Sequence, residues 1–264
     1  MRRAENNSFG ILMYHRVMPR ITGISAPKLN VTPPRFRRQL AGLLSRGYQA
    51  WPLRRVLACS RAGEPLPARV FVVTFDDGYD CIYHHAWPIL KELSVPATVF
   101  VVTSFLDAER PFVSDRWAGA GSADVPATAW NMLSSAHCAE MMADGLVEIG
   151  SHTHTHADFR GQPEAFRQDM AQSLGHLRSA LGLQQVSVAF PFGYYDADMV
   201  ATARDLGAVC GLTTQRELVS PRTDPFTWGR FNVQERDTAA TLVFKLSGWY
   251  TTMRRVSRLL KFGR

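Results

Sequence analysis

An apolar run that stops at two adjacent carboxylates constrains the fold of this chain more than any other stretch. Val70–Phe75 is apolar or β-branched throughout, and Asp76, Asp77 and Gly78 follow it directly. Such a run is typical of a strand buried on both faces, as in a parallel sheet. Neighbouring strand side chains point to opposite faces, but a glycine lets the backbone turn, so both acids can face one pocket. Taken alone, the stretch also fits an aspartate that caps the next helix.

Three histidines at alternate positions follow a second short apolar segment. His152, His154 and His156 come after Leu146–Ile149 and Gly150. His152 and His156 are four residues apart, so a helical turn would bring them to one face. Neutral imidazoles at this spacing suit a first-row divalent metal, and a carboxylate from another strand end would complete the set with open positions for water and substrate. We expect His154 to point elsewhere, as a polar residue at the rim.

Several short motifs together give the chain a family resemblance. They are Tyr14–Val17, Thr74–Gly78, Pro96–Val101, His152–His156 and Phe190–Gly193. With these motifs, the chain resembles the polysaccharide deacetylases, the chitin deacetylase or carbohydrate esterase family four group, over residues 9–232. The resemblance implies an α/β fold, a distorted (β/α) barrel with fewer than eight repeats. It also implies a metal-dependent hydrolase that removes N-acetyl groups from an N-acetylhexosamine-containing poly- or oligosaccharide.

The resemblance assigns roles to the two main motifs. Asp77, His152 and His156 would hold Zn²⁺ or another divalent first-row metal, and Asp76 would act as general base. The departing amine needs a general acid, for which a histidine is suited near neutral pH. The chain has no histidine after residue 176, and the subgroup with an N-terminal Tyr-His pair implies that His15 takes this role. The alternative for His15 is a structural histidine bonded to Asp76 or to the backbone.

The third motif of the family departs from its usual pattern here. Ala189 stands where the family has an arginine, and Phe190 replaces a proline. An arginine beside Asp76 would keep this carboxylate ionised. Arg230 is the candidate to supply the charge from another strand end, and an ordinary surface ion pair is the alternative for it.

The expected substrate groove draws on two further parts of the chain. Pro191, Phe192, Gly193 and Tyr194 are expected to shape it, with a backbone N–H around Tyr194 to hold the oxyanion. The connection over residues 103–128 is long and irregular, which is typical of a functional loop. Its Trp117 could stack on a sugar ring, although a buried indole in an exposed insertion is the alternative.

Hydrophobic periodicity predicts most of the remaining elements. The predicted strands and helices are Gly10–Tyr14, Leu53–Ala62, Tyr83–Leu93, Val95–Val102, Ala129–Gly145, Pro163–Leu181, Val186–Phe190, Asp198–Leu206 and Ala208–Thr214.

Length and composition agree with a single catalytic domain. The chain has 264 residues, 46% of them apolar, which suits one α/β barrel over residues 1–250. Four cysteines without a CxxC pair argue against a cysteine zinc site. No secretory signal precedes the first strand, so we expect a cytoplasmic protein. Residues 251–264 read as a basic amphipathic tail that could contact anionic lipid at the inner membrane face, and the alternative is a solvated face with a stripe that docks on the domain.

Three other functions stay open at this point. The first is a hydrolase of another non-peptide amide, such as a formamide or a small amide. The second is a catalytically degenerate member that binds glycans, suggested by the missing arginine and late histidine. The third is a basic adaptor, although we find no nucleic-acid motif. The natural glycan is taken, as a hypothesis, to be a lipid-linked precursor of a surface polysaccharide.

Overall fold

A curled parallel sheet forms the centre of the molecule. The computed structural model describes residues 8–24, 26–112 and 125–250. In spatial order the main strands are β10 (Phe231–Asn232), β1 (Gly10–Tyr14), β5 (Val70–Phe75), β6 (Ala97–Val101), β7 (Val147–Ser151), β8 (Val186–Ala189) and β9 (Ala208–Leu212), and β4 (Gln49–Ala50) pairs beside β5. Every pairing is parallel, and a further bridge joins Leu212 to Trp228 just before β10. The sheet thus curls so that its last strand, β9, approaches the segment that leads into β10 at the other edge. This confirms the distorted (β/α) barrel.

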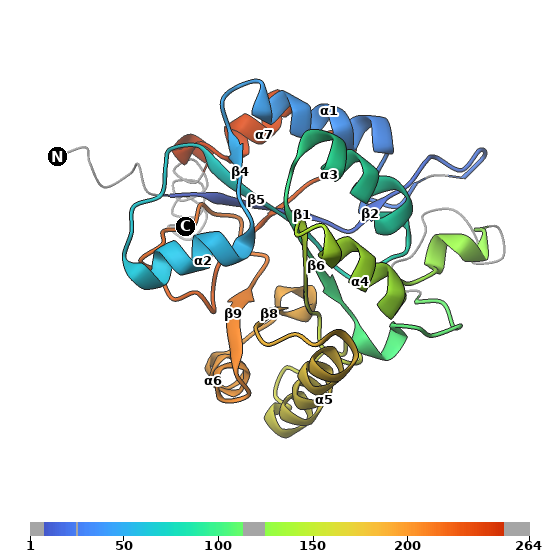
Figure 1. The fold of residues 1–264 in the computed structure, drawn as a ribbon, viewed down its shortest axis with the longest axis vertical. Helices are drawn as coiled ribbons and strands as arrows, with labels where there is room; N and C mark the ends of the chain where they lie inside the picture. Colours follow the sequence, from blue (N-terminus) through green and yellow to red (C-terminus); the bar gives the residue numbers. More distant parts are fainter. Residues whose placement is uncertain (1–7, 25, 113–124, 251–264) are drawn as a thin grey trace, which may run out of the picture.

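Helices cover the outside of the curled sheet (Figure 1). They are α1 (Pro33–Leu44), α2 (Leu53–Ala62), α3 (Trp87–Leu93), α4 (Ser135–Ala143), α5 (Pro163–Leu181), α6 (Ala197–Asp205) and α7 (Ala239–Lys245), and a π-helical turn over Ile82–Ala86 leads into α3. A small parallel pair, β2 (Arg16–Val17) with β3 (Asn30–Val31), lies after β1.

The strands are buried on both faces because the helices pack against one face and barrel side chains fill the other. Every residue of β1, β5 and β6 is buried. On α5, Phe166, Met170, Leu174 and Leu177 follow helical spacing and are fully buried, which anchors this helix to the sheet. Most predicted elements therefore recur within a few residues of their expected bounds.

The helix predicted over Ala129–Gly145 is wrong in its first half. A 3₁₀ turn ends at Trp130, and α4 begins only at Ser135. The intervening backbone pairs with the segment after β5: the Asp80 N–H donates to Asn131 O at 2.9 Å, and the Leu133 N–H donates to Gly78 O at 2.9 Å. These long-range hydrogen bonds replace helical ones, so apolar spacing alone misreads the segment.

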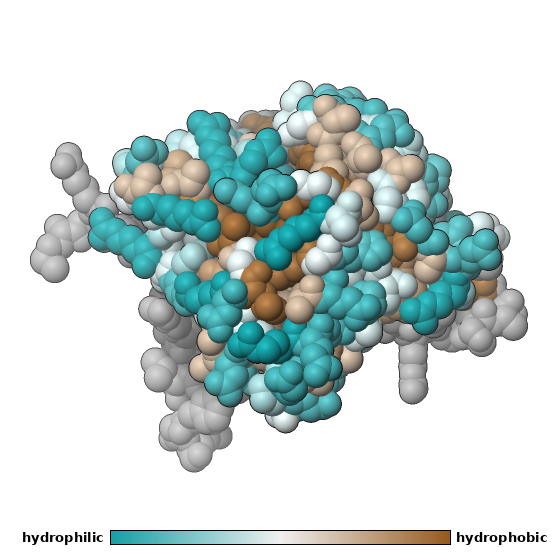
Figure 2. All heavy atoms as spheres, turned by 60° about the horizontal axis from the view of Figure 1, so that its bottom comes forward, coloured by the Kyte–Doolittle hydropathy of each residue, from teal (hydrophilic) through white to brown (hydrophobic). Residues whose placement is uncertain are grey.

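Three further features bear on the sequence predictions. Within the described ranges, no helix is both long and apolar enough to cross a membrane. Trp117 and residues 251–264 lie outside those ranges, so the predictions for them stay predictions. On the face that Figure 2 turns forward, hydrophobic residues gather near the centre between hydrophilic side chains.

Candidate active site

The two acids after β5 are turned into the barrel mouth by an unusual backbone. Asp77 and Gly78 both have left-handed conformations, with φ of 72° and 82°. A side chain at Gly78 would place its Cβ 2.9 Å from Val101 Cγ1, so the turn needs glycine. The Asp76 N–H donates to Tyr14 O at 3.0 Å and so extends the β1–β5 ladder. The left-handed turn after Asp76 lets two neighbouring carboxylates serve one site.

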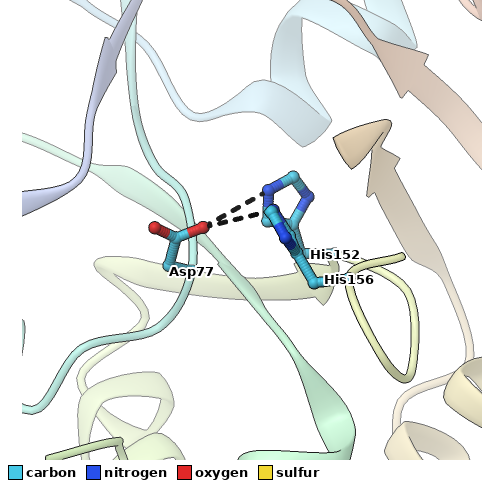
Figure 3. A group of neighbouring side chains, drawn as sticks. All are labelled: Asp77, His152 and His156. Atoms are coloured by element: carbon cyan, nitrogen blue, oxygen red, sulfur yellow. Dashed lines mark ion pairs between the residues drawn. The ribbon is translucent and has the colours of Figure 1, made fainter. Parts of the chain in front are cut away.

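Asp77, His152 and His156 converge at this mouth (Figure 3). Asp77 Oδ1 lies 3.6 Å from Nε2 of each histidine, and one ligand atom from each of the three residues lies within 4.8 Å of the others. Ligand atoms about 2.0–2.1 Å from a tetrahedral zinc lie roughly 3.4 Å apart. The spacing and the donor types therefore fit a divalent metal.

The two imidazoles are oriented and kept neutral by their surroundings. His152 Nδ1 lies 2.8 Å from Ala189 O, so it carries the proton and leaves Nε2 free toward Asp77. Burial lowers the pKa of both His152 and His156 to about 4. At neutral pH both are therefore in the form that binds a metal.

The expected helical turn between these histidines is wrong. Thr153 and His156 have left-handed φ values of 67° and 60°, which no α-helix contains. The loop is held instead by Asp169 of α5, whose carboxylate accepts from the His154 N–H at 2.6 Å, the Thr155 N–H at 3.1 Å and the Thr155 hydroxyl. His154 points away, with its Nδ1 3.0 Å from Thr103 Oγ1, as expected.

Sequence reasoning missed Asp169, although the sequence held a signal for it. The residue falls within the apolar stripe of α5, beside Phe166 and Met170, and is 8% exposed. A carboxylate is rarely buried without partners. An acid on an otherwise apolar helix face therefore indicated a partner in the loop before that helix.

Arg230 forms a buried bidentate ion pair with Asp76. Its two terminal nitrogens lie 2.6 Å from Asp76 Oδ1 and 2.8 Å from Oδ2, and its Nε donates to Thr213 O at 3.1 Å. Arg230 is fully buried, so the surface-pair alternative is wrong. Burial alone would raise the pKa of Asp76, but Arg230 and then His152 hold it well below its usual value. The charge missing at Ala189 is thus supplied from the segment before β10.

His15 lies at the end of β1, beside the same pair. Tyr14 is the register partner of Phe75, so His15 leaves β1 where Asp76 leaves β5, and its positive form would lower the pKa of both Asp76 and His156. Its Nδ1 is buried and has no hydrogen-bond partner in the described part of the chain. A buried nitrogen without a partner argues against a purely structural role through that atom.

The segment after β8 forms an aromatic rim on the site. Phe192 has a left-handed φ of 58°, is 51% exposed, and its ring centre lies 4.7 Å from that of His156. Tyr194 is also exposed, and the Arg160 guanidinium lies 3.8 Å from its ring centre. Both aromatic side chains therefore border the expected groove.

Two of the backbone N–H groups around Tyr194 that could have held the oxyanion are already used within this segment. The Tyr194 N–H donates to Pro191 O at 3.0 Å, and the Gly193 N–H donates to Phe190 O at 2.9 Å. Both groups are used to close the 3₁₀ turn over Pro191–Gly193. The prediction of an oxyanion hole around Tyr194 is wrong for these two groups.

Comparison with known families matches the region that carries both motifs. The family model described as polysaccharide deacetylase matches residues 63–211, more than half of the chain. The chain belongs to the polysaccharide deacetylase family. This confirms the resemblance and the assignment to the hydrolases.

The chain matches several known proteins over most of their length. A protein from Staphylococcus epidermidis named poly-beta-1,6-N-acetyl-D-glucosamine N-deacetylase is 27% identical, covering 93% of this chain and 85% of its own. Solved structures of IcaB from Ammonifex degensii (24% identical) and of the Streptococcus pyogenes deacetylase PplD (23% identical) each have a TM-score of 0.76, covering 91% of this chain and 98% of theirs. These two structures support the fold.

Proposed function

We propose that this protein is a metal-dependent N-deacetylase that hydrolyses the acetamide of N-acetylglucosamine units in a polysaccharide. One observation carries the proposal: a carboxylate held ionised by Arg230 lies next to an Asp-His-His set suited to a divalent metal. The name of the staphylococcal relative supports N-acetylglucosamine as the sugar. Zinc is the proposed metal, because a two-histidine, one-carboxylate set with open positions is typical of catalytic zinc.

Asp77, His152 and His156 would hold the ion. A bound divalent ion lowers the pKa of a water ligand and polarises a carbonyl oxygen. Asp76 then accepts the proton of the attacking water, and Arg230 keeps it ionised until that step.

The water oxygen adds to the acetyl carbon, the C–N bond breaks to give acetate, and the nitrogen takes up a proton as it leaves as an amine. His15 lies at the neighbouring strand end, on the same mouth as Asp76, and serves as the proposed general acid. Phe192 would contact the sugar at the rim. Since the base has its arginine partner, the missing family arginine no longer argues for a binding-only protein.

The proposed test is acetate release from short N-acetylglucosamine oligomers by metal-stripped and zinc-reconstituted protein. We expect zinc-dependent release in the wild type and loss of about 10²–10⁴-fold in Asp76→Asn and His15→Gln. His152→Ala should lose both zinc and activity. Zinc binding without release from any oligomer would contradict the proposal and favour another amide substrate or glycan binding alone.

The finer predictions on location belong with this proposal. A lipid-linked surface-polysaccharide precursor, a cytoplasmic location and contact of residues 251–264 with anionic lipid all stay predictions. A flotation assay with anionic liposomes tests the lipid contact. Equal flotation of the full chain and of a chain ending at residue 250 would contradict it.

A further inference from the structure

We infer that a basic cavity beside the active site binds an anionic oxygen group, a phosphate or a carboxylate, carried by the glycan. The cavity has a volume of about 600 Å³, and its polar lining includes Arg20, Lys28, Asn30, Thr32, Glu235 and Arg236. The inference rests on the proposed function only in assigning the anion to the glycan substrate.

The basic cavity lies at the same edge of the sheet as the catalytic groups. Strand β10 pairs with β1, which pairs with β5, and all three are parallel. The Val233 N–H donates to Met13 O at 3.0 Å, so residues 234–236 leave β10 where His15 leaves β1. Because the carboxyl ends of parallel strands share one edge, a chain of sugars bound over Asp76 can extend toward the basic cavity.

Positive charge is in excess around the basic cavity. Glu235 is its carboxylate, and this group already accepts from the Thr32 N–H at 2.8 Å and the Thr32 hydroxyl at 3.0 Å, with Arg20 at 3.4 Å. In the described part of the chain, neither Lys28 nor Arg236 has a carboxylate partner. Both are exposed, so their charges face the solvent-filled space.

A second hollow adjoins the basic cavity, and its mostly apolar lining carries further basic side chains. It shares Arg20, Thr32 and Glu235 with the first and adds Arg35, Arg38 and His85. Concave surfaces with an excess of one sign of charge concentrate counter-ions, so the two hollows together favour an anion.

The chemistry of the lining selects the ligand class. Guanidinium groups donate paired hydrogen bonds that match phosphate and carboxylate oxygens, and a neutral sugar would leave these cations without counter-charge. The volume suits a group of the size of one sugar with its substituent. Two sources supply this chemistry: a phosphate at the reducing end of the glycan, or an acidic sugar next to the acetylated one.

The test compares substrates of equal length. We would measure kcat/KM and calorimetric binding for a neutral N-acetylglucosamine oligomer, for the same oligomer with a reducing-end phosphate, and for an oligomer with one uronic acid beside the N-acetylglucosamine. We expect one of the two anionic oligomers to be preferred over the neutral oligomer on the order of tenfold. The preferred one identifies the source of the anion.

The variant Lys28→Gln/Arg236→Gln should bring the ratio of anionic to neutral binding close to one. The control Arg61→Gln/Arg222→Gln removes the same charge outside the basic cavity and should keep the ratio. Equal affinity for all three oligomers, or a preference that survives in Lys28→Gln/Arg236→Gln, would overturn the inference. If no oligomer is deacetylated but the calorimetric preference still depends on Lys28 and Arg236, the proposed function fails and the cavity assignment stands.

Discussion

Asp76 is a buried carboxylate whose ionised form is stabilised chiefly by Arg230. Burial alone would raise the pKa of Asp76, and Arg230 counters this through two hydrogen bonds. Replacing Arg230 by Met should therefore raise the pKa of Asp76. Because the proposed base acts ionised, the acid limb of the pH profile of kcat/KM should move to higher pH. A pH profile between 4 and 9 measures this shift.

Stability gives a second measurement on the same variant. Removing one partner of a buried ion pair leaves an uncompensated charge, which costs about 3–5 kcal/mol. Arg230→Met should lower the free energy of unfolding in urea by this amount, whereas Arg230→Lys keeps the charge and should restore part of it. An unchanged acid limb in a folded Arg230→Met protein would contradict the role given to Arg230.

Phe192 is an exposed aromatic residue that touches a metal-ligand candidate. Since half of its surface is exposed, Phe192→Ala should change stability by less than about 0.5 kcal/mol. Loss of its contact with the sugar should raise KM several-fold, in a steady-state assay with N-acetylglucosamine oligomers. Phe244→Ala, exposed to a similar degree on α7, is the matched control. Equal KM values for the two variants would exclude Phe192 from the groove.

At the scale of elements, α5 supports the loop that carries His152 and His156. Asp169 holds the loop backbone at two N–H groups, so Asp169→Asn should loosen both histidines without unfolding the helix. Supporting residues of this kind typically change metal affinity about 10–100-fold. Zinc titration should show this loss, and Asp205→Asn, an exposed carboxylate on α6, should not. Equal zinc affinity in the two variants would mean that Asp169 is only structural.

Elements with local signals were predicted well, and those set by distant contacts were not. Val70–Phe75 and Pro163–Leu181 recur with their predicted bounds, because their apolar patterns match a strand and a helix. The segment 131–134 departs from its helical pattern because it bonds to residues 78–80. The loop after β7 departs because Asp169 holds the N–H groups of His154 and Thr155, between the left-handed residues Thr153 and His156.

At the scale of the whole molecule, curling of the sheet brings the site together. Asp76 and Arg230 are 154 positions apart in the chain and form one ion pair. The Leu212–Trp228 bridge turns the segment before β10 back toward β1, which carries Arg230 under the mouth. Sequence motifs could identify Asp76 and Arg230 as candidates for the two sides of this ion pair. They could not exclude a surface position for Arg230, since no local pattern encodes the closure.

A metal at Asp77, His152 and His156 would join two strand ends, so binding should stabilise the whole molecule. A ligand at 1,000 times its Kd adds about 4 kcal/mol, which raises Tm by roughly 8–16 °C for a domain of this size. A thermal melt with and without zinc measures this rise, and His152→Ala should abolish it.

The pH dependence of the same binding tests the burial of the histidines. Protons compete for a histidine ligand only near or below its pKa, which burial lowers to about 4 for both His152 and His156. Zinc affinity should therefore change less than about twofold between pH 7.5 and 5.5, and fall as the pH approaches 4. Two histidines of ordinary pKa, about 6.5, would lose roughly a hundredfold over the same range. Calorimetry in matched buffers separates the two cases, and a hundredfold loss by pH 5.5 would mean that the imidazoles are open to water.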